Sequence, residues 1–280
     1  MTTSVSGSCA ALSHDVPLAG TAARIDGWLC VEIPGAWGRD VSDGTALGQE
    51  FADAFARLAA AADMRPMFIR RSGRAARRGH AILLARSHPT QTWCERLDVT
   101  NPRDVLDLDP GLLRSSAPGL GSRTDAVLVC AHGKRDRCCA VLGRPVAAHL
   151  AAEFGDIVWE CSHTGGHRFA PSMIVLPTGY TYGRLDGADS TEVVRAARRG
   201  DVVLPGLRGR SCWDPEGQVA EIAVRETVTA GADELTVEGT TVSHRDGRSW
   251  TVPVESYDLA PRAASCGADP KPVRALRAHI

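Results

Sequence analysis

The sequence is poor in aromatic residues, at 5% of its 280 positions, and has no excess of charge of either sign. Its 32 Lys and Arg residues nearly balance its 33 Asp and Glu residues, which leaves a net charge of −1. This balance excludes a strongly basic nucleic-acid-binding protein, although a local basic patch is still compatible with it. Lysine occurs only at Lys134 and Lys271, and asparagine only at Asn101, a bias typical of a high-GC bacterial genome.

Long hydrophobic runs are also missing. No apolar stretch approaches the roughly 20 residues that a membrane span needs. The N-terminus lacks the basic region followed by an apolar region that marks a secretory signal. At 44% hydrophobic and 23% charged residues, the composition is nevertheless that of a folded chain. We therefore expect a soluble, cytoplasmic protein that binds neither membranes nor nucleic acid.

Cysteine and histidine, in contrast, are abundant, with nine of each. Nine is an odd number, and in an intracellular chain closely spaced cysteines are more often metal-binding or catalytic than disulfide-bonded. There is no C-x-x-C motif, and Cys138 and Cys139 are adjacent, which is a poor geometry for a dithiol cycle. Ordinary thiols without a partner at useful spacing are expected at five further positions: Cys9, Cys30, Cys94, Cys212 and Cys266.

The hydrophobic patterns predict an α/β protein. Helices are expected over residues 46–62, 139–154, 191–199 and 216–229. Strands are expected over residues 28–33, 67–71, 81–86, 126–130, 157–161, 173–176 and 180–185, with a hairpin from 234–242 and 248–254. The order of elements after residue 125 is close to a thioredoxin-like layout, and the first half has a similar order. We therefore predict two thioredoxin-like halves in tandem, followed by a small α+β extension.

The predicted organisation has five parts. They are a flexible N-terminus (1–20), an N-terminal α/β half (21–114), a Ser/Pro/Gly-rich linker (115–124), a thioredoxin-like domain (125–206), and an extension with a helix, a β-hairpin and a tail (207–280).

Two local motifs in the domain 125–206 carry the chemistry. Eight residues separate Cys130 from Cys139, which gives the pattern C-x₈-C. Three residues separate His163 from His167 in the sequence H-T-G-G-H. Cys130 ends one predicted strand, Cys139 begins the next helix, and the two histidines follow the neighbouring strand. Sites in α/β sheets gather at the carboxyl ends of strands, and the Gly-Gly pair permits a tight turn. We therefore expect two thiolates and two imidazoles to converge.

Such a donor set is compatible with tetrahedral zinc or with a [2Fe–2S] cluster that has mixed ligands. The spacing fits neither usual template, since a zinc finger would carry C-x₂₋₄-C before its histidines. The loop between Cys130 and Cys139 is wide enough to enclose a larger inorganic core. In the alternative interpretation, each cysteine is a small buried hydrophobic residue and each histidine a hydrogen-bonded loop residue.

The same stretch resembles the sucrase/ferredoxin-like family, whose members include thioredoxin-like [2Fe–2S] ferredoxins. The match is carried by V-C-A-H-G-K-R-D-R-C-C (129–139), G-R-P-V-A-A-H-L (143–150), H-T-G-G-H-R-F-A-P (163–171) and, upstream, G-W-L-C-V-E-I-P-G-A-W-G-R-D (27–40). The resemblance implies cluster ligands at Cys130, Cys139, His163 and His167. Cys138 departs from the family pattern and could take the place of Cys139, which keeps the family spacing.

Residues around the motifs have both functional and structural interpretations. A basic rim is formed by Lys134, Arg135, Arg137 and Arg168, which could dock an acidic redox partner or be a solvated loop face. His132 lies between Cys130 and Cys139. It could be an alternate ligand of the metal or an ordinary hydrogen-bonding residue. Because thioredoxin-like folds often carry a cis-proline before the strand that faces the site, we predict that Pro171 is cis.

The leading functional hypothesis is a soluble [2Fe–2S] protein that acts in one-electron transfer or redox sensing, as an electron carrier rather than a catalyst. One alternative is a zinc-binding structural or interaction module, and another is a thiol-based thioredoxin-like redox protein. The family's name also suggests sucrose hydrolysis. Glycosidases need two carboxylates across a sugar site, and no such pair stands out, so we discount hydrolysis.

Overall fold

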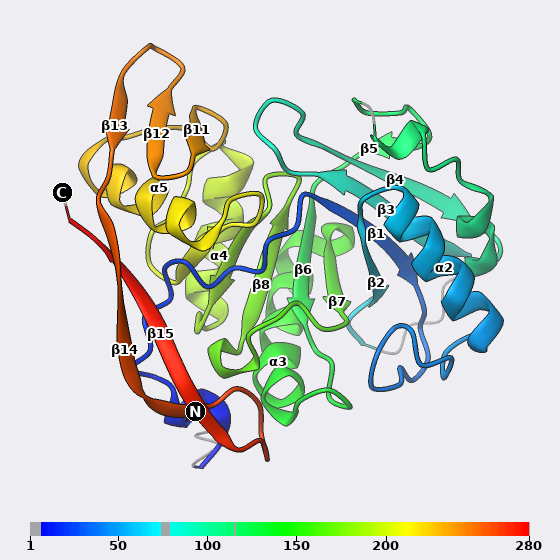
Figure 1. The fold of residues 1–280 in the computed structure, drawn as a ribbon. Coiled ribbons are helices and arrows are strands. Elements are labelled where there is room, and N and C mark those ends of the chain that lie inside the picture. Colours follow the sequence, from blue (N-terminus) through cyan, green and yellow to red (C-terminus); the bar gives the residue numbers. More distant parts are fainter. Residues whose placement is uncertain (1–6, 74–78, 115, 280) are drawn as a thin grey trace.

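The structure is a computed structural model that describes residues 7–73, 79–114 and 116–279. It is a mixed α/β fold built around one ten-stranded sheet, with a three-stranded sheet and a two-stranded ribbon from the C-terminal part of the chain (Figure 1). The predicted α/β class is therefore confirmed. Among the described helices, none is both long and apolar enough to cross a membrane.

The main sheet draws on both halves of the chain. Its strands, in spatial order, are β10 (Leu207–Arg210), β9 (Tyr180–Gly183), β8 (Ser172–Leu176), β6 (Ala126–Cys130), β7 (Val158–Cys161), β2 (Arg65–Arg70), β1 (Gly27–Glu32), β3 (His80–Arg86), β4 (Trp93–Val99) and β5 (Ser122–Arg123). The halves meet where β2 runs antiparallel to β7, with Ile69 opposite Cys161. β5 lies within the expected linker, of which residue 115 is outside the described residues, and β10 lies at the start of the expected extension.

The two halves repeat one strand order. In the first half β1 pairs parallel with β2 and antiparallel with β3, which pairs antiparallel with β4. In the second half β6 pairs parallel with β7 and antiparallel with β8, which pairs antiparallel with β9. Parallel neighbours need a crossover connection, and the crossovers contain α2 (Gln49–Ala61) and α3 (Arg137–Phe154). Each half is thus a β-α-β unit extended by two antiparallel strands.

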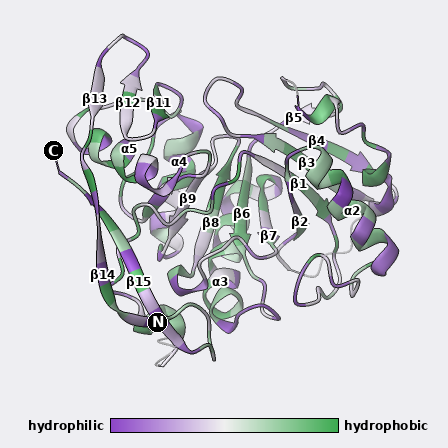
Figure 2. Cartoon of the chain, in the orientation of Figure 1, coloured by the Kyte–Doolittle hydropathy of each residue, from purple (hydrophilic) through white to green (hydrophobic). Residues whose placement is uncertain are grey.

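Continuous apolar runs explain why β1 and β6 are inner strands, each flanked on both sides within its own half of the sheet. Both are buried along their whole length, as expected for strands covered on both faces, and the central sheet is mainly hydrophobic in Figure 2. Alternate residues of the two strands, such as Trp28 and Leu128, share one core that crosses both halves. The opposite face packs in two separate cores, with Leu29 beside α2 and Val127 beside α3.

The C-terminal part adds two helices, a small sheet and a ribbon. These elements are α4 (Gly187–Arg198), α5 (Pro215–Thr227), the sheet β11 (Leu235–Glu238), β12 (Thr241–His244) and β13 (Ser249–Thr251), and the ribbon β14 (Val254–Ala263) and β15 (Pro270–Ala278). Short 3₁₀ helices are η1 (Pro102–Asp107), η2 (Leu112–Arg114), η3 (Gly155–Ile157) and η4 (His167–Phe169).

The ends of the chain come together beside α3. The ribbon β14–β15 runs along one side of the molecule toward the N-terminal helix α1 (Cys9–Leu12) (Figure 1). Cys9 of α1, Cys138 of α3 and the side chain of Ala263 in β14 share a small apolar core. Residues 1–6 of the segment expected to be flexible lie outside the described residues. The N-terminal and C-terminal segments are thus attached to the start of α3.

Candidate metal centre

The strand pairing brings the two sequence motifs to one end of the sheet. Cys130 is the last residue of β6, and it lies in register with Cys161, the last residue of the parallel strand β7. The chain leaves β6 toward α3, whose first turn holds Cys139, and leaves β7 toward His163 and His167. Parallel strands therefore place all four side chains at their shared carboxyl end.

Two local features fix the start of α3. Asp136 is its N-cap residue, and the carboxylate accepts the backbone N–H of Cys138 at 2.7 Å. About two turns after Asp136, Gly143 lies directly against β6: a Cβ at this position would stand 2.0 Å from the carbonyl oxygen of Cys130. The missing side chain lets the helix approach the strand closely, and this approach brings Cys139 near Cys130.

We call the four predicted ligands the Cys/His group (Cys130, Cys139, His163 and His167). Each of them lies beside two others, so that their contacts form a closed circuit. Cys139 Sγ lies 3.3 Å from Nδ1 of His167. The imidazoles of His163 and His167 stack with their centroids 4.0 Å apart and their planes at 20°. The side chains of Cys139 and His163 in turn lie close enough to Cys130 to lower the pKa of its thiol. The structure thus brings together the residues that the sequence motifs selected.

The protonation of this group follows from its burial and contacts. A hydrogen bond from Cys139, supported by one from His163, holds the pKa of the Cys130 thiol well below its usual value. The pKa of Cys139 is raised, because it shares this hydrogen bond and is buried beside a thiolate. Burial, followed by the neighbouring His163, lowers the pKa of His167 to about 4. These shifts favour the thiolate of Cys130 and the neutral imidazole of His167.

Two arginines that no sequence pattern pointed to hold the segment between β7 and β8, residues 162–171, which carries His163 and His167 and which we call the histidine loop. The side chain of Arg208 in β10 is buried and donates to the carbonyl of Gly165 at 3.2 Å and to the hydroxyl of Ser172 at 2.9 Å. Arg65 in β2 donates to the carbonyl of His163 at 2.9 Å. Both arginines are remote in sequence from the loop and belong to no local motif, so no sequence signal identified them.

His132 positions the same loop from the other side. Its Nε2 lies 2.8 Å from the carbonyl oxygen of Gly38, to which it donates, and its Nδ1 accepts the backbone N–H of His163 at 3.2 Å. Both ring nitrogens are therefore used by backbone groups. In this arrangement His132 acts as a hydrogen-bonding residue.

Three residues of the basic rim lie between Cys130 and Cys139, and the fourth, Arg168, follows His167. Lys134 and Arg137 are exposed, while Arg135 is half-buried and lies 3.6 Å from the carboxylate of Asp40. Arg168 is half-buried, with its guanidinium 5.1 Å from the ring centroid of Phe169.

Lys134 also lines a surface cavity together with Arg70 and Arg144. The rim is thus positively charged and in part open to solvent.

The peptide bond before Pro171, which precedes β8, is cis.

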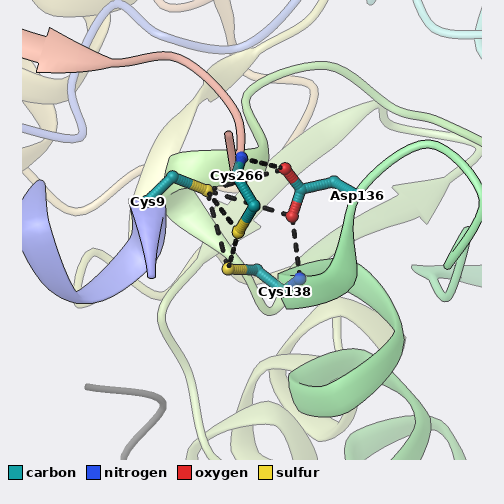
Figure 3. Close-up of side chains that lie close together, drawn as sticks. All are labelled: Cys9, Asp136, Cys138 and Cys266. Atoms are coloured by element: carbon teal, nitrogen blue, oxygen red, sulfur yellow. Dashed lines mark hydrogen bonds between the residues drawn. The ribbon is translucent and has the colours of Figure 1, made fainter. Parts of the chain in front are cut away.

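A second set of donors lies beside the first, and we call it the three-thiol group (Cys9, Cys138 and Cys266, with Asp136). The Sγ–Sγ distances are 3.5 Å for Cys9–Cys138, 3.3 Å for Cys138–Cys266 and 3.6 Å for Cys266–Cys9 (Figure 3). The expectation that Cys9 and Cys266 lack partners is therefore wrong. It failed because each is more than 120 residues from Cys138, a separation that no spacing motif records.

The remaining cysteines have structural positions. Cys30, Cys94 and Cys161 lie in the core shared by both halves, and Cys212 is also buried. Burial raises the pKa of each of these thiols, so they stay protonated at neutral pH. They are core residues, as expected for thiols without a metal or a charged partner.

The cysteine, histidine and aspartate donors are close enough together to hold a metal ion. Besides the three-thiol group with Asp136, donor atoms of Asp136, Cys139 and His167 lie within 4.8 Å of one another. A comparison with protein-family models matches residues 18–209 to the model described as sucrase/ferredoxin-like. Comparisons with curated proteins and with solved structures gave no significant match.

Proposed function

The chain belongs to the sucrase/ferredoxin-like family, and from this premise we propose that it is a [2Fe–2S] protein that transfers single electrons or senses redox state. Cys130, Cys139, His163 and His167 would hold the cluster. The observation that carries this proposal is the closed circuit of contacts in the Cys/His group, because it joins two soft sulfur donors to two imidazoles at one end of the sheet.

The chemistry of the donors fits this cofactor. Iron–sulfur clusters are bound by thiolates, and in Rieske-type centres two imidazoles replace two of them. The lowered pKa of Cys130 favours a thiolate donor, and the lowered pKa of His167 favours a neutral imidazole donor. Because imidazoles carry no charge, this site has two fewer negative charges than a site with four thiolates.

The spread of the donors favours a two-iron core over a single ion. Around one tetrahedral zinc ion, with bonds of about 2.0–2.3 Å, all donors lie within about 4 Å of one another. In the described part of the chain, no three donors of the Cys/His group come within 4.8 Å of one another as a set. A [2Fe–2S] cluster needs this wider arrangement, since its four ligands are divided between two irons.

A bound [2Fe–2S] cluster would supply a one-electron couple, and the surrounding residues would control access to it. Cys130, Cys139 and His167 are buried, whereas His163 is half-exposed, so an electron partner would reach the cluster through His163. Lys134 and Arg137 are exposed nearby and would favour an acidic partner. Arg208, Arg65 and His132 keep the histidine loop in place.

We also propose that the two halves are thioredoxin-like units in tandem. The repeated strand order, with a parallel β-α-β unit followed by two antiparallel strands, supports this interpretation. The thiol-redox alternative would use a dithiol cycle between the adjacent residues Cys138 and Cys139. It is less well supported than the cluster, because Cys138 contacts the sulfur of Cys266 whereas Cys139 contacts the imidazole of His167.

The proposal is tested on protein purified under anaerobic conditions. We expect about two iron atoms and about two acid-labile sulfides per chain, together with the uptake of one electron per chain in a reductive titration. Substitution His163→Ala should remove the iron and the brown colour. The matched control is His149→Ala, which removes an exposed imidazole from α3 and should leave the iron content unchanged.

Two results would overturn the proposal. One is a colourless wild-type protein in which the Cys/His group binds zinc, which would support the zinc-module alternative. The other is a full complement of iron in the His163→Ala variant.

A further inference from the structure

The three-thiol group is assembled from three segments that are far apart in the sequence. Cys9 comes from α1, Cys138 from the first turn of α3, and Cys266 from the turn between β14 and β15 (Figure 3). Cys9 and Cys138 are buried, and Cys266 lies at the surface. Cys9 and Cys266 also lie outside residues 18–209, the region that the family model matches, so the family does not account for this group.

The distances between the sulfurs fit one shared metal ion. A disulfide would join only two of the three sulfurs, at about 2.05 Å, and would leave the third without a partner. Here the three Sγ–Sγ distances are nearly equal, at 3.3, 3.5 and 3.6 Å. In a tetrahedral site with Zn–S bonds of about 2.3 Å, neighbouring sulfurs are about 3.8 Å apart. Outward movements of a few tenths of an ångström would therefore admit the ion.

Asp136 supplies a carboxylate beside the three sulfurs. Its two oxygens lie 3.7 and 3.9 Å from Cys9 Sγ. One oxygen accepts the backbone N–H of Cys138 and the other that of Cys266, each at 2.7 Å. These bonds hold the buried carboxylate in a fixed orientation, and each oxygen keeps a further lone pair. Three thiols and one carboxylate together make a complete tetrahedral set of zinc ligands.

We propose that Cys9, Cys138, Cys266 and Asp136 bind one zinc ion. Each thiol releases its proton to solvent as its S–Zn bond forms, and no oxidant or reductant takes part. The ion links α1 and the β14–β15 turn to the first turn of α3, the turn that also holds Cys139. Zinc at this position therefore fastens the N-terminal and C-terminal segments to the helix that contributes to the Cys/His group. It also assigns Cys138 to this site rather than to the other.

The test is the zinc content of the full-length chain after anaerobic purification and dialysis against a weak chelator. We expect about one zinc ion per wild-type chain and almost none in Cys266→Ala, because the variant loses one of three sulfur ligands. Ser265→Ala changes the neighbouring residue of the same turn and should keep its zinc. Since Cys266 is at the surface, its substitution should leave the far-ultraviolet circular dichroism unchanged.

X-ray absorption at the zinc edge of the wild-type protein provides a second, element-specific readout. We expect three sulfur neighbours at about 2.3 Å and one oxygen at about 2.0–2.2 Å. Two sulfurs with two nitrogens would place the zinc in the Cys/His group and overturn the proposal. Absence of zinc from the wild-type protein, or a disulfide within the group under anaerobic conditions, would also overturn it. None of these readouts depends on iron, so this proposal and the [2Fe–2S] proposal can fail separately.

Discussion

The Cys/His group and the three-thiol group start at adjacent residues, Cys139 and Cys138, but differ in how widely their donors are spread. In the three-thiol group every sulfur lies within 3.6 Å of the other two. In the Cys/His group no three of the four donors, all of them in the described part of the chain, lie within 4.8 Å of one another as a set. Consecutive residues of an α-helix point about 100° apart, so one helical turn can serve both groups. The compact group suits one ion and the open one suits a two-metal core.

The two groups also differ in how they are assembled. The Cys/His group is built within one half of the sheet, from residues 130–167, where β6, α3 and β7 are connected in sequence. The three-thiol group needs both terminal segments to reach α3. The first group therefore draws all four donors from one half of the sheet. The second requires the N-terminal segment and the β14–β15 ribbon to be in place, so it should be the more easily disrupted of the two.

The largest expected effect comes from Cys130→Ala. We predict nearly complete loss of iron and acid-labile sulfide, because this residue provides the thiolate of the Cys/His group. Zinc should stay near one ion per chain. Cys161→Ala is the matched control, since Cys161 lies opposite Cys130 at the end of the paired strand and is equally buried. Equal iron loss in both variants, measured by elemental analysis, would mean that core packing and not ligation retains the iron.

A smaller effect is expected from Gly143→Ala, which tests how closely α3 must approach β6. The added methyl would collide with the carbonyl oxygen of Cys130, and overpacking of this kind costs about 1–3 kcal/mol of unfolding free energy. The helix should shift and the iron content should fall in part. Ala148→Gly, at an exposed position of the same helix, should cost about 1 kcal/mol while iron is retained. Denaturant unfolding and iron analysis of both variants measure this difference.

The smallest effect is expected from charge reversal in the basic rim. In the variant Lys134→Glu with Arg137→Glu, oxidation of the reduced protein by ferricyanide, a trianion, should slow severalfold and depend less on ionic strength. The metal contents should not change. Arg198→Glu, an exposed arginine on α4, is the control and should keep the wild-type rate. An unchanged rate in the rim variant, measured by stopped-flow absorbance, would show that the rim is only a solvated loop face.

Sequence patterns predicted the elements that position the Cys/His group. The strand expected over 126–130 is β6, and the helix expected over 139–154 is most of α3. Both predictions rest on local hydrophobic patterns, which are strong in buried strands and amphipathic helices. The convergence of the two motifs follows from the parallel pairing of β6 and β7. Local spacing and one topological rule therefore suffice for this group.

The ribbon β14–β15 and the three-thiol group could not be predicted in this way. Most residues of the ribbon are at least partly exposed, including Pro261 and Pro270, so its strands lack a regular apolar pattern. Its pairing and its approach to α1 depend on tertiary contacts between the two ends of the chain. Cys9 and Cys266 meet Cys138 only because of those contacts, as do Arg65 and Arg208 with the histidine loop.

The most direct measurement is the ratio of iron to zinc in two variants that differ by one position, Cys138→Ser and Cys139→Ser, each purified anaerobically as the full chain. The account predicts opposite losses: Cys138→Ser keeps its iron and loses its zinc, whereas Cys139→Ser keeps its zinc and loses its iron. Loss of the same metal from both variants would contradict it, because the two adjacent cysteines would then serve a single site.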